Sequence, residues 1–337
     1  MKKLFIIIFV IFEVNSQNVR PIRDDVGYCW NLNSMRKIIE YLQSVDSMNI
    51  EPGFIAAISP HDDYLYTASV YFPVMKNIYV DEVIIFGVTH STVRKEINNP
   101  LGKIILDDYD NWKGLTSDVQ ISPLRDLIKS KLDTSFFIIS NKAHMLEHSI
   151  ESQIPFLNYF NRNFKITPIM VTEMDFHRMK EITKELSEIL FDYIKYKNLE
   201  FGKNILILIS SDANHYGNDF NNTPFGEDEG SHTKAIGEDL RIIRDYLEGP
   251  LEEEKIQNFM AEMKNMVWCG KYSIPFGMLT LKNLTNKINN KVVIGKLVSY
   301  SDTYSNGVLP LKKIGIGTTA PFSLKHWVGF FTLVFYN

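Results

Sequence analysis

Three runs of apolar residues in this chain each break off into small polar residues followed by a histidine. These runs precede His61, His90 and His215. Short apolar runs of this kind are typical of strands that are buried on both faces of an α/β sheet. Ligands of open α/β sheets bind just beyond the carboxyl ends of the strands. The pattern therefore predicts a metal site or an acid–base site at that edge, with three imidazoles brought to it.

The order of the predicted elements indicates a single α/β domain. A strand at residues 55–59, a helix at 67–77 and a strand at 82–86 follow one another with short links, as in a βαβ unit. No linker rich in Gly, Pro or Ser divides the 337 residues, and single α/β domains of this size are common. We therefore predict an α/β/α sandwich with a mixed, largely parallel central sheet, formed by residues 17–337 as one domain.

Apolar periodicity and turn residues predict the other elements. The helices cover residues 35–42, 122–132, 147–156, 176–196, 234–247, 252–265 and 274–284, and the strands cover 102–106, 164–171, 204–209, 292–300 and 315–319. The polar segment 220–230 is a loop and a candidate lid. The apolar tail at 327–336 is compatible with an edge strand or with a surface for a partner.

The first 16 residues have the pattern of a secretory signal peptide. Lys2 and Lys3 precede an apolar run from Leu4 to Phe12, and a Val-Asn-Ser sequence ends at Ser16. The run is too short to span a bilayer as a mature helix, and a buried N-terminal strand is the alternative. We expect cleavage after Ser16 and export to the periplasm or the exterior, with no membrane span in the mature chain.

The charge balance argues against a nucleic-acid partner. The formal net charge is −4, and no cluster of basic residues offsets it. A nucleic-acid-binding protein needs a basic face, so we expect no nucleic-acid partner.

Two further histidine segments contain candidate functional residues. Asp212 lies three residues before His215, where its carboxylate could fix the imidazole tautomer or cap a following helix. His144 and His148 are four residues apart, so both would share one face of a helix that ran through them. A solvated helix start is the alternative for His144, whereas the pattern favours a functional role for His148.

Cys269 is a candidate soft metal ligand. It precedes Gly270, which would allow a close approach of the backbone, although a buried structural cysteine is the common alternative. As a thiolate beside two imidazoles it would give a three-ligand site with open coordination positions. A disulfide with Cys29, the second of the two cysteines, would remove it from this role, and the composition leaves pairing and free thiols equally open.

Five motifs in series resemble the Memo family, whose bacterial and archaeal members are called AmmeMemoRadiSam system protein B. In chain order they are Pro60-His61-x-x-Tyr64, Phe86-Gly87-x-x-His90, Glu147-His148-Ser149-Ile150-Glu151-x-Gln153-x-Pro155-Phe156-Leu157, Ser210-Ser211-Asp212-x-x-His215-Tyr216-Gly217 and Cys269-Gly270. The start, Val19-Arg20-Pro21 followed by Gly27-Tyr28, is also similar, so that the resemblance covers roughly residues 19–319.

The chain departs from the family pattern at two places. Asp62 and Asp63 stand where the family usually has Ala-Gly, and Ser91 stands where many members have a second His. The two acids would add negative charge to the pocket or cap the next helix.

The resemblance implies a fold similar to that of class III extradiol dioxygenases, which are non-haem iron enzymes. It implies metal ligation by His61, His90 and Cys269. Fe(II) is the expected metal, with copper and zinc as alternatives that also suit these ligand types. The implied function is redox chemistry on a small molecule.

The resemblance also places Asp212, His215 and His148 in the same pocket. In the redox hypothesis His215 and His148 move protons, and Asp212 orients His215. Two other functions are compatible with these residues. One is a catalytically silent adaptor that binds a peptide or phosphopeptide in the pocket, and the other is a zinc-dependent hydrolase with His215 as its base.

Overall fold

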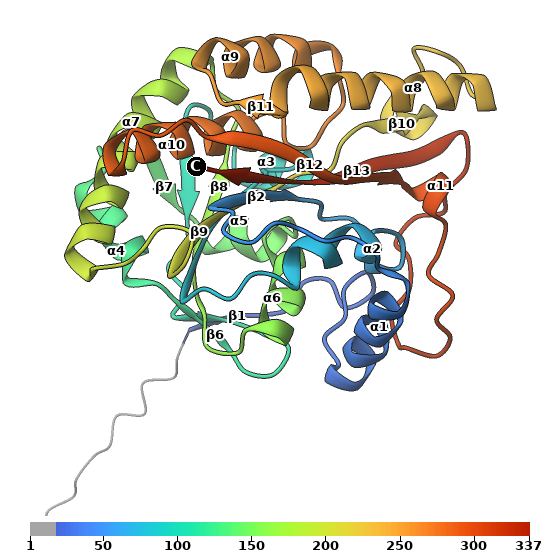
Figure 1. The fold of residues 1–337 in the computed structure, drawn as a ribbon, viewed down its shortest axis with the longest axis horizontal. Helices are drawn as coiled ribbons and strands as arrows, with labels where there is room; N and C mark the ends of the chain where they lie inside the picture. Colours follow the sequence, from blue (N-terminus) through green and yellow to red (C-terminus); the bar gives the residue numbers. More distant parts are fainter. Residues whose placement is uncertain (1–17) are drawn as a thin grey trace, which may run out of the picture.

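A mixed sheet runs through the centre of the protein in the computed structural model, which describes residues 18–337 (Figure 1). The strand order is β1-β5-β6-β8-β3-β9-β2-β13-β12-β11, with β10 paired to β13 and β4 paired to β7 and β8. The neighbours from β6 through β8, β3 and β9 to β2 are parallel, whereas β2, β13, β12 and β11 pair antiparallel. The predicted fold class is confirmed. The predicted signal peptide lies outside the described residues.

The strands and helices have the following bounds. The strands are β1 (Val19–Arg20), β2 (Ala56–Ser59), β3 (Glu82–Gly87), β4 (Ile104–Leu106), β5 (Asn111–Trp112), β6 (Val119–Ile121), β7 (Phe137–Ile139), β8 (Lys165–Val171), β9 (Ile205–Ser210), β10 (His215–Gly217), β11 (Gly249–Pro250), β12 (Ile294–Asp302) and β13 (His326–Tyr336). The α-helices are α1 (Leu32–Val45), α2 (Tyr64–Met75), α3 (Ser91–Glu96), α4 (Pro123–Lys131), α5 (Asn141–Leu146), α6 (Ile154–Phe160), α7 (Phe176–Lys197), α8 (Glu229–Ile242), α9 (Glu253–Glu262), α10 (Ser273–Ile288) and α11 (Thr303–Asn306). Short 3-10 segments are η1 (Glu151–Gln153), η2 (Asn218–Phe220) and η4 (Met263–Asn265), and η3 (Ile243–Leu247) is a π-helical turn that extends α8.

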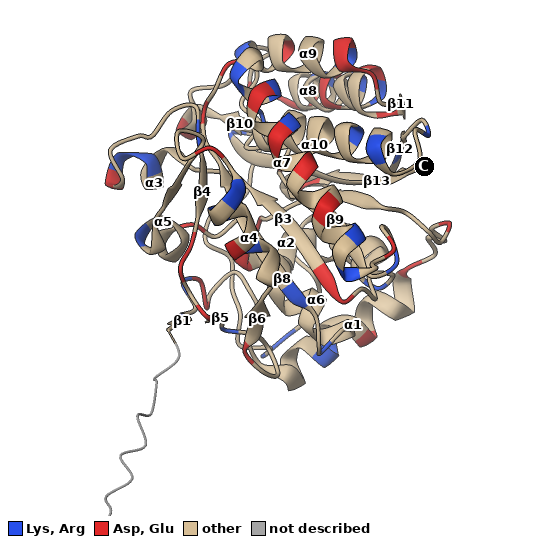
Figure 2. Cartoon of the chain, turned by 90° about the vertical axis from the view of Figure 1, so that its left-hand side faces the viewer, with Lys and Arg blue, Asp and Glu red and all other residues tan. Residues whose placement is uncertain are grey.

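Helices cover both faces of the sheet, so the central strands are apolar on both sides. In β3, Ile84 and Phe86 belong to the core that also holds α7 and α10, while Val83 and Ile85 belong to the core that holds α1, α2 and α6. Successive residues of a strand point to opposite faces, which explains why this strand reads as a continuous apolar run. Charged residues of both signs lie on the outer helices such as α7 and α9 (Figure 2).

The segment before α6 differs from the prediction. A helix was expected over residues 147–156, but α5 ends at Leu146 and regular helix resumes only at Glu151. The Glu147 carboxylate accepts the backbone N–H groups of His148 and Ser149, which holds these residues in a turn. His144 and His148 therefore do not share one helix face.

The structure also tests two predictions about the C-terminal part of the chain. The expected strand at 315–319 is wrong, because this segment bonds to loops: Gly317 N–H donates to the Val26 carbonyl and Thr319 N–H to Asp63. The apolar tail forms β13, which is an interior strand between β2 and β12 rather than an edge. Among residues 18–337, no helix is long and apolar enough to cross a membrane.

Candidate metal centre

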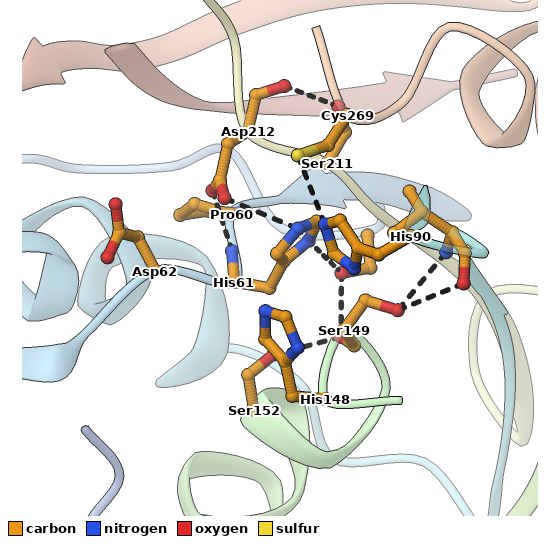
Figure 3. Close-up of polar contacts among 12 residues, drawn as sticks. Pro60, His61, Asp62, His90, His148, Ser149, Ser152, Ser211, Asp212 and Cys269 are labelled. Atoms are coloured by element: carbon orange, nitrogen blue, oxygen red, sulfur yellow. Dashed lines mark hydrogen bonds and ion pairs between the residues drawn. The ribbon is translucent and has the colours of Figure 1, made fainter. Parts of the chain in front are cut away.

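The carboxyl ends of the adjacent strands β2, β3 and β9 bring the predicted site residues together. His61 follows β2 by two residues, His90 follows β3 by three, and Asp212 follows β9 by two. Figure 3 shows His61, His90, His148, Asp212 and Cys269 gathered at this edge. The predicted location at the carboxyl edge is thus the one that the structure has.

The His61 imidazole is buried and has one ring nitrogen without a hydrogen-bond partner. Its Nδ1 lies 2.9 Å from Ser210 Oγ, and this hydroxyl donates its own proton to the Ser149 carbonyl at 2.7 Å. Nδ1 must therefore carry the proton, which leaves the lone pair on Nε2. Within the described chain Nε2 has no hydrogen-bond partner, although Asp212 Oδ2 lies 3.3 Å away. A buried imidazole nitrogen in this state is suited to bind a metal ion.

His90 is held by Glu147, a residue to which the sequence reasoning gave no role. The Glu147 carboxylate accepts from His90 Nδ1 at 2.8 Å and from the His90 backbone N–H at 3.0 Å. His90 Nε2 then faces Cys269 Sγ at 3.3 Å. A carboxylate on one ring nitrogen fixes the tautomer and raises the basicity of the other, as in many metal sites. Burial alone would raise the pKa of Glu147, but the His90 charge and hydrogen bonds hold it well below its usual range.

Arg20 anchors the segment that carries Glu147 and His148. Its guanidinium donates to the carbonyls of His144 and Glu147, at 2.7 and 2.8 Å, and forms an ion pair with Glu151 at 3.1 Å. The guanidinium is almost fully buried, so these acceptors replace the water that it loses. Arg20, near the start of the chain, therefore helps to hold the loop that carries Glu147 and His148 in place.

Cys269 places its sulfur between two imidazoles. Sγ lies 3.3 Å from His90 Nε2 and 3.4 Å from His215 Nε2. Burial acts to raise the pKa of the thiol, but the positive charges of His215 and His90 outweigh it and lower that pKa well below its usual range. Cys29 is buried elsewhere and both thiols are free, so the alternative of a disulfide is not realised.

His148 and His144 have different surroundings. The His148 ring stacks on His90 with centroids 4.6 Å apart, and meets His61 edge-on at 5.5 Å. Burial and the neighbouring His90 hold the pKa of His148 well below its usual range. His144 points into the core, where its Nε2 lies 3.1 Å from the Ile105 carbonyl oxygen. Only His148 belongs to the site.

Asp212 contacts a different histidine from the one expected. The sequence suggested that it orients His215, but its Oδ1 accepts the His61 backbone N–H at 2.8 Å and its Oδ2 lies beside His61 Nε2. The reason is the parallel pairing of β2 with β9, which sets the end of one strand against the end of the other. His215 instead has its Nδ1 3.3 Å from the Ala213 carbonyl oxygen, and its Nε2 toward Cys269.

A second carboxylate that sequence reasoning missed braces the loops that carry Cys269 and His215. Asp239, on α8, accepts from Trp268 Nε1 at 2.9 Å and from the Tyr300 hydroxyl at 2.7 Å. Trp268 and Asn214, the residues before Cys269 and His215, form an isolated β-bridge. Asp239 is fully buried and far along the chain from both loops, so no local pattern marks it.

Gly270 is needed for this packing. A Cβ atom at this position would lie 2.1 Å from Ser211 Oγ, which is too close for any side chain. The predicted close approach of the backbone beside Cys269 is therefore confirmed.

The donor atoms fit a metal ion. Ligand atoms of His61, His90 and His148 lie within 4.8 Å of one another, as do those of His61, Asp212 and Cys269. The short contact between His90 and Cys269 joins the two sets. Imidazole and thiolate are the donors that zinc, copper and iron accept in proteins.

Two cavities meet at this centre. One has a volume of about 510 Å³ and the other about 420 Å³, and His90, His215 and Phe220 line both. The second also contains Asp62, whose carboxylate points away from the imidazoles (Figure 3). Burial and the charges of Asp212 and Asp63 raise the pKa of Asp62 to about 7. Neither Asp62 nor Asp63 caps α2 with its side chain.

The fold and the site together define a class of protein. It is an α/β/α sandwich with histidines and a cysteine at the carboxyl edge of its parallel strands. Residues 27–308 match the family described as Memo-like protein. The chain belongs to the Memo-like protein family, as its motifs suggested.

Similar proteins from archaea carry the same family name. A MEMO1 family protein of Sulfurisphaera tokodaii is 31% identical over 260 residues, which is 73% of this chain and 76% of that protein. A MEMO1 family protein of Desulfurococcus amylolyticus is 27% identical, over 74% of this chain and 77% of its own length. The similarity therefore extends over most of the domain rather than over isolated motifs.

Proposed function

We propose that His61, His90 and Cys269 hold one metal ion, in the first place Fe(II), and that the protein performs redox chemistry on a small molecule. The observation that carries this proposal is the arrangement of two imidazole nitrogens around one thiol. His90 Nε2 faces Cys269 Sγ at 3.3 Å, and His61 Nε2 is buried with no hydrogen-bond partner among residues 18–337. A bound iron would offer open positions for dioxygen and substrate and would exchange electrons with them.

The residues around the centre have distinct proton states. The Cys269 charge overcomes burial and raises the pKa of His215 to about 9, so His215 carries a proton at neutral pH that it can deliver into the pocket. His148 is held neutral, and a proton transferred to it would be bound only weakly. Asp212 fixes the backbone of His61 and compensates positive charge beside it.

Zinc-dependent hydrolysis is the second candidate function. Two imidazoles and a thiolate also form a well-known catalytic zinc set. His215 is the base in this hypothesis, and it would first have to lose the proton that it carries at neutral pH. The third candidate function is an adaptor that binds a peptide or phosphopeptide without turnover. It predicts that the purified protein contains no bound metal.

Elemental analysis of protein purified without oxygen separates these functions. We expect about one equivalent of iron or copper, whose reversible oxidation is followed optically. Stoichiometric zinc would favour the hydrolase, and a wild-type protein that binds none of these metals would contradict the proposal.

The two cysteines supply a matched pair of variants. Cys269→Ser should lose most of the metal with the fold intact, because a site residue on a loop contributes little to the core. Cys29→Ser should keep the metal while the free energy of unfolding falls by about 1–2 kcal/mol, since a hydroxyl replaces a buried thiol. Equal metal content in both variants would remove Cys269 from the ligand set.

A further inference from the structure

The two cavities beside the candidate metal centre are lined by different charged side chains. The larger one is lined by three basic side chains, Arg94, Lys264 and Lys271, and its lining contains no Asp or Glu. The smaller one is lined by four aspartates and one arginine; these are Asp24, Asp62, Asp63, Asp212 and Arg23. A negatively charged ligand is therefore better suited to the larger cavity, and a positively charged ligand to the smaller one.

The lysines of the larger cavity are not neutralised by the protein. Within the described chain neither Lys264 nor Lys271 forms an ion pair, whereas Arg94 pairs with Glu173 at 3.2 Å. Arg94 lies on the short helix α3, which carries both basic and acidic residues (Figure 2). Lys271 Nζ lies 5.3 Å from the centre of the Tyr272 ring, and the two lysines, without carboxylate partners among the described residues, make the lining of this cavity basic.

Apolar and aromatic side chains form a further part of the lining, and the cavity has the size of a small ligand. Val88, Val171, Met266, Trp268 and Tyr272 contribute to the wall. A cavity of about 510 Å³ with an apolar wall and a few charged groups lies within the range of small-molecule sites. Cys269 and His90 line the same cavity, so one molecule can touch the wall, the lysines and the centre together.

We propose that the larger cavity binds a small organic anion, whose carboxylate or phosphate contacts Lys264 and Lys271 while its apolar body lies against Trp268 and Tyr272. This inference rests on the proposed function, since it assigns the substrate of the same centre to the class of organic anions. The smaller cavity, with four aspartates in its lining, suits such a group less well.

Simple aromatic probes of one size test the inference. Benzoate, phenyl phosphate, neutral benzamide and cationic benzylamine are titrated into metal-free and zinc-loaded protein, and binding is followed by ligand-observed NMR and calorimetry. We expect benzoate or phenyl phosphate to bind about ten times more tightly than benzamide at low salt, with the difference shrinking as salt rises. Benzylamine should bind most weakly, and the better of the two anions separates a carboxylate ligand from a phosphate ligand.

Charge variants locate the site. Lys264→Gln together with Lys271→Gln should reduce anion binding to the level of benzamide and leave benzamide unchanged, and Lys271→Arg should restore it in part. Lys37→Gln is the control, because Lys37 is an exposed lysine on α1, outside both cavities. Zinc content of each variant is measured alongside, since Lys271 is two residues from Cys269.

The outcomes separate this inference from the proposed function. Anion binding that depends on the lysines in a protein that takes up no metal would support the anion site and contradict the metal function. Stoichiometric metal binding with equal affinity for benzoate, phenyl phosphate and benzamide, or with no measurable binding of either anion in the millimolar range, would overturn the anion site alone.

Discussion

The Glu147 carboxylate accepts a hydrogen bond from His90 Nδ1 at 2.8 Å, and thereby directs Nε2 of the same ring toward Cys269. Its Oε1 also accepts the backbone N–H groups of His148 and Ser149. One side chain thus sets both the tautomer of a candidate ligand and the course of the next loop.

Replacement of Glu147 should weaken metal binding in a graded way. Glu147→Gln keeps an oxygen for His90 Nδ1 but loses the charge, and we expect the metal affinity to fall about tenfold; Glu147→Ala removes every bond, and a loss of about 100-fold is expected. Competition with a chromophoric chelator measures the affinity. The exposed Glu40→Gln on α1 is the control, and equal affinity in Glu147→Ala and wild type would show that the carboxylate does not support the site.

The two thiols should differ sharply in reactivity. The lowered pKa of Cys269 favours its thiolate, while burial raises the pKa of Cys29 to about 11 and keeps it protonated. Iodoacetamide should therefore modify metal-free native protein once, at Cys269, at a rate that rises less steeply with pH than that of an ordinary thiol. Peptide mass mapping identifies the site. Modification of Cys29 before unfolding, or a rate at Cys269 that rises tenfold per pH unit, would contradict this expectation.

Asp239 should couple stability to pH. Burial raises its pKa in the folded protein to about 7, although Tyr300 and Trp268 donate hydrogen bonds that act in the opposite direction. A raised pKa means that the folded state holds the proton more tightly than the unfolded state, so the stability linked to this group is greatest near pH 4 and declines as the pH rises toward 7.

The variant Asp239→Asn isolates this effect. It should lower the free energy of unfolding by about 1–3 kcal/mol, because the amide accepts one of the two donated bonds well. It should also remove the pH-linked decline, so that wild type and variant converge as the pH rises. Denaturant unfolding at several pH values measures both, with Tyr300→Phe as the control that retains the carboxylate. A difference between wild type and Asp239→Asn that is constant with pH would refute the raised pKa.

The predicted export is tested on the N-terminus. If residues 1–16 are a signal peptide, protein from the exported fraction should begin near Gln17, and its intact mass with and without reductant should be the same because Cys29 and Cys269 are unpaired. An exported chain that still begins at Met1 would contradict the cleavage. A mass that rises on reduction by two hydrogen atoms would show a disulfide and contradict the prediction that both thiols are free.

The strand ends could be predicted because they depend on local properties. Both faces of β2, β3 and β9 are covered, so each reads as an apolar run. His61 and His90 mark where the runs of β2 and β3 stop. The family motifs then brought Cys269 to the same place. These features can be predicted from neighbouring residues along the chain, or from several family motifs that occur in the expected order.

The supporting contacts could not be predicted in the same way. The contact between Asp212 and His61 spans 151 residues, and those of Asp239 depend on where α8 packs against the loop of Trp268. Which way a side chain turns at the end of a strand is decided by the neighbouring strand, not by its own sequence. The only sequence signal for Glu147 was that it lies in the same motif as His148. Nothing in the distance along the chain between Glu147 and His90 indicated their contact.

The position of β13 sets the order in which the site is completed during synthesis. This strand follows every other element in the chain, yet it lies inside the sheet, and Gly329 bonds through its carbonyl to Ala213 N–H and through its N–H to the Asn214 carbonyl. The backbone that presents His215 therefore lacks these two hydrogen bonds until β13 has joined the sheet. If the proposed centre binds a metal ion, it does so in its final geometry only once this strand is in place.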